Sequence, residues 1–242
     1  MIGSPLSRLL SLRLIANMGA AVVGPRLKDG TVAPNFYVNR EGIMRQIVLA
    51  VMLSLFCVAS VFANPSVCAV KMPNGSMGSC TYIGNGLFVT NHHVVEGNTR
   101  AVVETLDGEK YPCDVLIASK EDDIAIIEAD GPVILPSVQI AERPVKAGEK
   151  VTAYGYGASY HDTDPAIDRR EWVGSMRGTG RIGGSVSDNA YVFSNPAIPG
   201  DSGGGCFNED GEYIGPLFGT DGKNTYACMN SELHKLLRSL DR

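Results

Sequence analysis

The chain has 242 residues, a hydrophobic content of 44% and a formal net charge of −5. This length allows one or two domains with a real core, and the moderate charge and a mean hydropathy of +0.03 exclude wholesale disorder and a multi-span membrane protein. The charge is uneven, because residues 1–43 carry +3 whereas residues 64–242 carry −9. An acidic globular part repels phosphate backbones, so we expect no nucleic-acid partner.

Residues 44–63 read MRQIVLAVMLSLFCVASVFA, a basic start followed by an apolar run and small residues. This pattern predicts a secretory signal peptide that is cleaved after Ala63, which implies a secreted or periplasmic protein. An uncleaved anchor is the alternative, because Ile47 to Ala63 is 17 residues, the short limit for a membrane-spanning helix. We therefore expect no stable membrane partner unless this segment is retained.

The signal begins at the internal Met44 rather than at residue 1. Residues 1–43 are interpreted as an over-extended start of the reading frame or as a leader. In both cases we expect them to lie outside the fold, which leaves 64–242 as the folded domain.

Five cysteines remain after the signal: Cys68, Cys80, Cys113, Cys206 and Cys228. An odd number leaves at least one thiol unpaired, and spacing alone does not fix the pairing. Cys68 could pair with Cys80 across a hairpin, and Cys206 with Cys228 between later strands, so a disulfide is expected.

Nothing in the sequence predicts a metal or a cofactor. No CxxC pair supports zinc coordination. The acids of HDTDPAID at 161–168 suggest calcium, but Pro165 and a missing central glycine argue against an EF-hand loop. We interpret this stretch as a solvated loop.

From Ser66 onward, short apolar runs alternate with turn signals, as in TYIG before NG and RAVVETL before DGEK. This pattern predicts antiparallel β structure, as a sandwich or as barrels, rather than βαβ units. The C-terminal SELHKLLRSLDR has leucines at helical spacing and predicts the one helix. Three prolines between about 130 and 147 indicate a connector between two β-rich halves.

Three stretches carry chemistry: VTNHHVV at 89–95, DDIAII at 122–127 and PGDSGGG at 199–205. They supply an imidazole base, a carboxylate to orient it and a serine in a glycine-rich turn. In this order they resemble the trypsin-like (chymotrypsin-fold) serine endopeptidases over about residues 66 to 240. The resemblance implies an all-β fold of two antiparallel six-stranded barrels, at about 66–130 and 148–230, joined by a linker at 131–147 and followed by a helix at 231–241.

The resemblance also implies the roles of the site residues. Ser202 is the expected nucleophile, and the backbone N–H groups of Gly200 and Ser202 are the expected oxyanion hole. In TNHHV the family pattern selects His93 as the base and leaves His92 in a structural position. In DDIA it selects Asp123 as the acid.

Two other interpretations fit parts of this pattern. GDSGG also fits the nucleophile elbow of α/β-hydrolases, but in that fold an acid and then a histidine follow the serine. Here the only later histidine, His234, lies in the expected helix. The other alternative is a catalytically silent binding module with a protease fold, which has no physical need for a complete triad.

Motif spacing is closer to bacterial HtrA-like peptidases, because His93 and Asp123 are only 30 residues apart. Two features depart from that pattern. No PDZ-sized segment follows the protease region, and Asp201 precedes the nucleophile where HtrA-like proteins typically have Asn.

Asp201 requires a partner, since a buried carboxylate without one is costly. Cleavage after Ala63 leaves too short an arm for a new N-terminus to reach it. We therefore predict an internal cation or donor, with four candidates in the preceding segment: Arg169, Arg170, Arg177 and Arg181.

Family alignment places the substrate pocket wall at Leu217 to Thr220 and its base near Asn195 and Pro196. Asn195, Phe218, Gly219 and Thr220 are thus the expected substrate-binding residues. No acidic residue occupies the position at which trypsin selects Lys or Arg, so we expect an apolar or small P1 residue. The expected partner is a protein or peptide substrate, and the expected state is a monomer.

Overall fold

A computed structural model describes residues 64–157, 169–180 and 190–240. The signal peptide, the residues before it and the HDTDPAID stretch lie outside the described residues. Among the described residues, no helix has the length and apolar character needed to cross a membrane.

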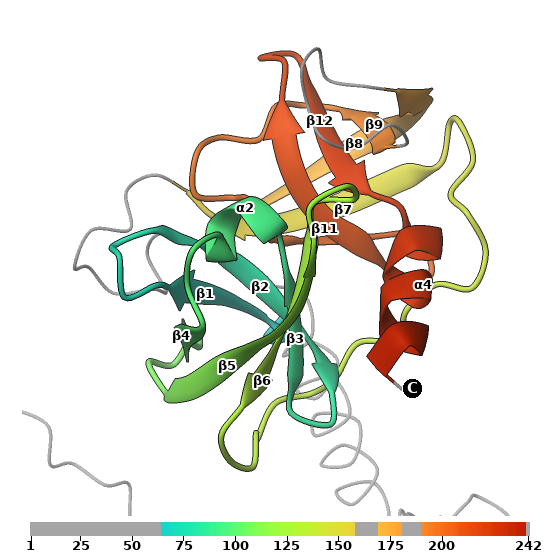
Figure 1. The fold of residues 1–242 in the computed structure, drawn as a ribbon. Coiled ribbons are helices and arrows are strands. Elements are labelled where there is room, and N and C mark those ends of the chain that lie inside the picture. The colour runs from blue at the N-terminus through green and yellow to red at the C-terminus, as the bar shows by residue number, and fades with distance from the viewer. Residues whose placement is uncertain (1–63, 158–168, 181–189, 241–242) are drawn as a thin grey trace, which may run out of the picture. The chain divides into compact units, whose positions relative to one another are not determined.

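The first half of the described chain is a closed antiparallel barrel of six strands (Figure 1). Its strands follow the order β1-β2-β3-β6-β5-β4, and β4 pairs with β1 to close the sheet. They are β1 (Val67–Lys71), β2 (Met77–Gly84), β3 (Leu87–Thr90), β4 (Arg100–Glu104), β5 (Lys110–Ser119) and β6 (Ile124–Ala129), with the one-turn helix α2 (His92–Val95) after β3.

The second half is a second closed barrel, in the order β10-β11-β12-β9-β8-β7, with β7 paired to β10. Its strands are β7 (Lys150–Tyr156), β8 (Arg169–Gly180), β9 (Ala190–Ser194), β10 (Gly205–Phe207), β11 (Tyr213–Thr220) and β12 (Asn224–Cys228), followed by helix α4 (Asn230–Leu240). The predicted fold of two six-stranded antiparallel barrels and a short C-terminal helix is confirmed.

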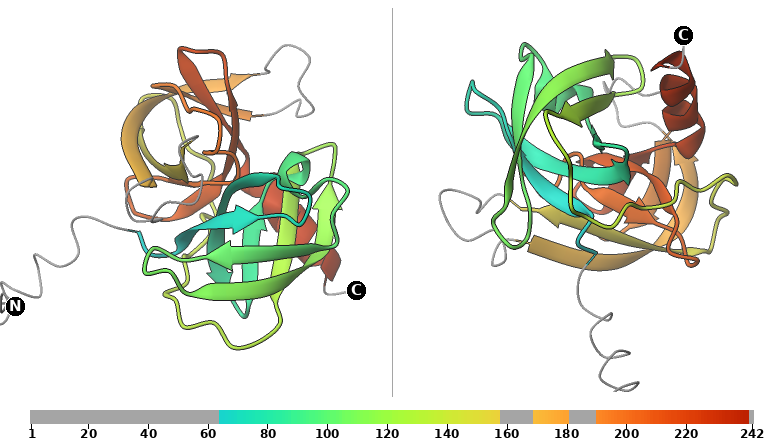
Figure 2. Two further views of the ribbon diagram at one scale, coloured as in Figure 1. Left: turned by 90° about the vertical axis from the view of Figure 1, so that its left-hand side faces the viewer. Right: turned by 90° about the horizontal axis from the view of Figure 1, so that it is seen from below.

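The alternation of side chains explains how one strand serves two cores. In β6, Ala125 and Ile127 face the interior of the first barrel, whereas Ile124 joins the cluster that also contains Tyr156 and Tyr213 of the second barrel. Successive residues of a strand point to opposite faces, so β6 supplies both the barrel core and the surface on which the second barrel packs. In the left view of Figure 2 the strands of the first barrel are blue-green to green, and those of the second are yellow to red.

The turn between β2 and β3 follows from its sequence. Asn85 and Gly86 have φ angles of +53° and +80°. A two-residue turn with two positive φ angles matches the right-handed twist of the strands, and Asn-Gly is its preferred sequence. This hairpin brings β3 into the barrel and leads directly to α2.

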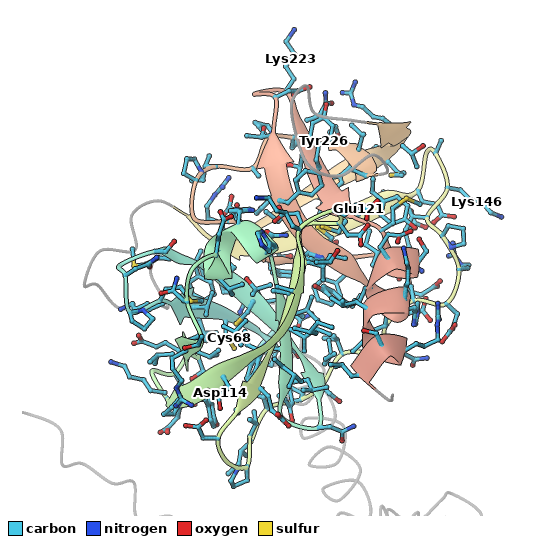
Figure 3. The ribbon with its side chains drawn as sticks, in the orientation of Figure 1. Cys68, Asp114, Glu121, Lys146, Lys223 and Tyr226 are labelled. Atoms are coloured by element: carbon cyan, nitrogen blue, oxygen red, sulfur yellow. The ribbon has the colours of Figure 1, made fainter. Side chains whose placement is uncertain are left out.

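All five described cysteines are buried free thiols, so the expected disulfide is not formed in this structure. Cys68 and Cys80 do lie opposite each other on β1 and β2. Cys206 and Cys228 lie on β10 and β12, which β11 separates. Burial raises the pKa of Cys68 and of Cys113 to about 12, which keeps both thiols protonated and unreactive at neutral pH. Figure 3 labels Cys68 within the first barrel.

Candidate active site

His93 lies in α2, at the end of the first barrel that faces the second. Val94 and Val95 are buried in the core of the first barrel and anchor this single turn. The His93 side chain is 44% exposed. The helix therefore fixes the backbone while it leaves one edge of the imidazole accessible.

Asp123 immediately precedes β6 and holds His93 at two points. Its Oδ1 accepts a hydrogen bond from the His93 backbone N–H at 2.9 Å, and its Oδ2 accepts one from Nδ1 at 2.7 Å. Because a carboxylate can only accept, the ring proton is on Nδ1, and Nε2 is left as the basic nitrogen. This is the tautomer that a general base toward a hydroxyl requires.

His92 and Asp122, the sequence neighbours of these two residues, do not take part in the hydrogen-bonded pair. Asp122 accepts a hydrogen bond from the Ser119 hydroxyl at 2.8 Å. His92 has no contact with Asp123 among the described hydrogen bonds, whereas His93 has two. The structure thus brings together His93 and Asp123, the pair selected from the sequence.

Asp123 adopts a backbone conformation that is rare for a residue with a side chain. Its φ is +52°, in the left-handed region. Its carbonyl accepts a hydrogen bond from Asn91 Nδ2 at 2.8 Å, and the Cys228 thiol of the second barrel lies 3.2 Å from the Asp122 carbonyl. These buried contacts stabilise the turn that aims the carboxylate at His93.

Ser202 lies in a turn near the end of the loop at 195–204, which joins β9 to β10. A side chain at Gly203 would place Cβ 1.9 Å from the Ser79 carbonyl and 2.3 Å from the Thr90 hydroxyl. The turn therefore contacts β2 and the end of β3, three residues before His93. Among the described residues, no hydrogen bond joins the Ser202 hydroxyl to the His93 ring. Such bonds are often long in the absence of substrate.

Gly200 and Ser202 were expected to supply the oxyanion hole. Gly200 has a φ of +95°, and a Cβ there would lie 2.5 Å from the Tyr156 carbonyl, so only glycine fits. The neighbouring N–H groups of Asp201 and Gly203 donate to backbone carbonyls. Those of Gly200 and Ser202 donate no hydrogen bond to a described residue.

Asp201 is fully buried, and Arg170 on β8 is its partner. Its Oδ2 accepts hydrogen bonds from Arg170 Nη1 and, at 2.8 Å, from the Ile198 N–H. Burial raises the pKa of Asp201 from 3.8 to about 6, against the opposing effect of these two donors. The prediction of an internal cation is confirmed. Arg181, the last of the four candidates, lies outside the described residues.

The expected substrate-binding residues lie on two segments of the second barrel, the loop after β9 and the end of β11. Asn195 is exposed in the loop after β9, and its side chain donates to the Val173 carbonyl at 2.6 Å. Phe218 is buried against Tyr226, with ring centroids 6.4 Å apart. Gly219 and Thr220 are partly exposed at the end of β11, and β12 pairs with this part of the strand.

Two hollows lie elsewhere on the surface of the described residues. One of about 580 Å³ includes Lys150, Tyr154 and Glu209 of the second barrel, and one of about 400 Å³ includes Lys71 and Lys110 of the first. Neither is lined by a residue of the site. Within the described ranges, no group of three or more His, Cys, Asp or Glu side chains is placed to hold a metal ion.

Sequence reasoning missed Ser79 as a residue of this site. It is fully buried on β2 and contacts the turn that carries Ser202. The sequence gives no signal that separates Ser79 from other small polar residues in strands. Only the packing of the two barrels against each other identifies it.

Comparison with known families and structures supports the fold and identifies the family. The model of the trypsin-like peptidase domain matches residues 78–215, over half of the chain, and this range includes His93, Asp123 and Ser202. Serine protease HTRA1B of Danio rerio is 34% identical over 133 residues, which cover 54% of this chain and 27% of the relative. A probable periplasmic serine endoprotease DegP-like of Halomonas elongata is 31% identical over 148 residues, covering 58% and 28%.

Among solved structures, the HtrA-type protease AlgW with a tripeptide has a TM-score of 0.63 at 21% identity, covering 74% of this chain and 60% of that one. The inactive form of Rv3671c protease has a TM-score of 0.60 at 21% identity, covering 73% and 89%. These likenesses show the shared fold. The matched regions span less than a third of the length of the curated relatives. This chain belongs to the trypsin-like peptidase domain family and is related to the HtrA and DegP serine proteases.

Proposed function

We propose that this protein is an exported serine endopeptidase that hydrolyses peptide bonds with Ser202, His93 and Asp123. The observation that carries the proposal is the double hydrogen bond from His93 to Asp123, at 2.9 Å from the backbone and 2.7 Å from Nδ1. It leaves Nε2 free to accept a proton. Export is proposed from residues 44–63, and a secreted or periplasmic location follows from it.

In the first half of the reaction, His93 Nε2 removes the proton from Ser202 Oγ as this oxygen attacks the scissile carbonyl carbon. The negative charge that develops on the carbonyl oxygen is stabilised by the N–H groups of Gly200 and Ser202. One such donor lowers the barrier by about 3 kcal/mol. The imidazolium then protonates the leaving amine, the C–N bond breaks, and an acyl-enzyme remains.

In the second half, water attacks the acyl-enzyme while His93 Nε2 accepts its proton. The same two N–H groups stabilise the second oxyanion. The intermediate then releases the carboxylic acid product, and His93 returns the proton to Ser202 Oγ. Asp123 remains ionised throughout and stabilises the imidazolium in both halves.

The substrate is proposed to be a polypeptide with an apolar or small P1 side chain. Asn195, Phe218, Gly219 and Thr220 are the proposed substrate-binding residues. None of them carries a charge, which favours an uncharged P1 residue.

Hydrolysis of an unfolded protein substrate tests the proposal. The mature protein should cleave it, and Ser202→Ala or His93→Ala should lower kcat roughly 10⁴-fold or more. Asp123→Asn should lower kcat roughly 10⁴-fold, because the amide favours the wrong imidazole tautomer.

The chain contains matched controls for two of these substitutions. His92→Ala and Asp122→Ala change adjacent residues of the same type whose side chains form no described hydrogen bond with Ser202, His93 or Asp123, and both variants should retain most of the activity. If the wild-type protein is folded but does not hydrolyse the substrate, the result would favour a catalytically silent binding module. The absence of a described hydrogen bond between Ser202 and His93 is compatible with that alternative.

A further inference from the structure

Ser79 of the first barrel contacts the turn that carries the proposed nucleophile. It lies on β2 and has no exposed surface. Its neighbour Gly78 makes this approach possible, since a Cβ there would lie 2.8 Å from the Ser202 carbonyl oxygen. The backbone of β2 in the first barrel is therefore in direct contact with the backbone of the Ser202 turn in the second barrel.

Four hydrogen bonds connect Ser79 to the site. Its N–H donates to the Ser202 carbonyl at 2.7 Å, and its hydroxyl donates to the Gly200 carbonyl at 3.0 Å. The hydroxyl also accepts from the Tyr156 N–H at 2.9 Å. Its own carbonyl accepts from the Thr90 hydroxyl at 2.7 Å, just before the segment that carries His93.

These bonds fix two particular peptide groups. The carbonyls of Gly200 and Ser202 belong to the peptide groups on either side of the Asp201–Ser202 peptide, whose N–H is a proposed oxyanion donor. With its two neighbours held, this peptide has little freedom to rotate. The Asp201 side chain between them is itself held by Arg170.

We propose that Ser79 is a positioning residue for catalysis, whose hydroxyl holds the Gly200 to Ser202 turn in the orientation that directs its N–H groups at the oxyanion. This inference rests on the proposed serine peptidase function. Ser79 does not touch the reacting atoms, and it acts through the turn. Electrostatic stabilisation depends on donors that are already oriented, so a small rotation of this turn reduces the rate.

The Ser79→Ala variant tests this role, because it removes the hydroxyl and keeps both backbone hydrogen bonds. The probe is a fluorophosphonate, which reacts with an activated serine whatever the peptide specificity. Its maximum labelling rate and its half-saturating concentration are measured per folded molecule. We expect the maximum rate to fall roughly 10- to 100-fold, with little change in the half-saturating concentration.

Thr81→Val is the matched control. Thr81 lies two residues along the same strand and is equally buried, but its hydroxyl forms no hydrogen bond with the turn that carries Ser202. This variant should label at the wild-type rate. A purely structural role of Ser79 would lower the folded fraction and leave the rate per folded molecule unchanged, and that result would overturn the inference.

Ser79→Cys keeps the test decisive if the alanine variant does not fold. A thiol fills the site but is a weaker donor and acceptor than a hydroxyl. The labelling rate of Ser79→Cys should therefore lie between those of the wild type and Ser79→Ala. If Ser79→Ala yields no folded protein, the rate of Ser79→Cys should still lie below that of the wild type. A wild-type rate in Ser79→Cys would again contradict the role. Wild-type protein that fails to label would instead refute the proposed function.

Discussion

Asp201 shows how one buried carboxylate can organise the turn that follows it. Its partner Arg170 lies opposite Gly155 in the pairing of β7 with β8. A Cβ at Gly155 would lie 2.7 Å from Asp201 Oδ1, so the missing side chain leaves space for the carboxylate. The Arg170 guanidinium stacks 4.8 Å from the centre of the Trp172 ring. Four arginines were candidates from the sequence, and only this strand register singles out Arg170.

Loss of Arg170 should reduce both stability and activity. Arg170→Ala leaves a buried carboxylate without its cation. We expect this to lower the free energy of unfolding by about 3 kcal/mol at pH 8, the low end of the range for buried pairs, because the guanidinium is partly exposed to solvent. The maximum rate of fluorophosphonate labelling should fall at least roughly 10-fold, because the Asp201 side chain no longer fixes the turn. Arg177→Ala on the same strand removes an exposed arginine and is the control. Equal stability and activity of the two variants would contradict this account.

The raised pKa of Asp201 predicts a dependence of stability on pH. With a pKa of 3.8 in the unfolded chain and about 6 in the folded protein, the folded state retains this proton between about pH 4 and pH 6 while the unfolded state releases it. The contribution of Asp201 to stability is therefore largest below pH 4, falls as the pH rises through about 6, and is constant above that.

Denaturant unfolding of the wild type and of Asp201→Asn, from pH 4 to pH 7.5, measures this effect. The free energy of unfolding of the wild type minus that of the variant should decrease by about 2 kcal/mol across the window. A difference that stays constant or grows with pH would show that this carboxyl ionises at or below its usual pKa in the folded protein.

At the scale of elements, the turn from Gly200 to Gly204 approaches β2 because Gly203 has no side chain. Gly203→Ala should destabilise the protein by at least about 2 kcal/mol more than Gly211→Ala. Both glycines have positive φ angles, +86° and +77°, so the backbone strain is matched. Only Gly203 has atoms within reach of a new Cβ, and Gly211 has none within 4 Å. Chemical denaturation measures both, and equal losses would mean that the turn can move away from β2.

Much of the element structure could be predicted from the sequence. Apolar runs broken by turn signals predicted antiparallel strands, and the Asn85-Gly86 turn has the conformation that its residues favour. The three motifs selected the pair His93 and Asp123 over their identical neighbours. Contacts between strands distant in sequence could not be predicted, since the position of Ser79 under the nucleophile turn depends on how two separate sheets meet.

At the scale of the whole described domain, the site combines contributions from both barrels. His93 and Asp123 belong to the first barrel and Ser202 to the second, and Cys228 and Ser79 each form hydrogen bonds across the boundary. The number and closure of the barrels came from the family resemblance, because alternating patterns fit a sandwich equally well. Cysteine pairing was not predictable either. Cys206 and Cys228 lie on strands that a third one separates.

Identification of the residue that a fluorophosphonate modifies tests the central claim most directly. Folded mature protein is treated with the probe, digested and analysed by mass spectrometry. We expect one adduct per molecule, on the Ser202 hydroxyl, and no adduct in His93→Ala treated for the same time. Modification of a different residue, or no modification of the folded wild-type protein, would contradict the assignment of this chain as a serine endopeptidase that acts through Ser202.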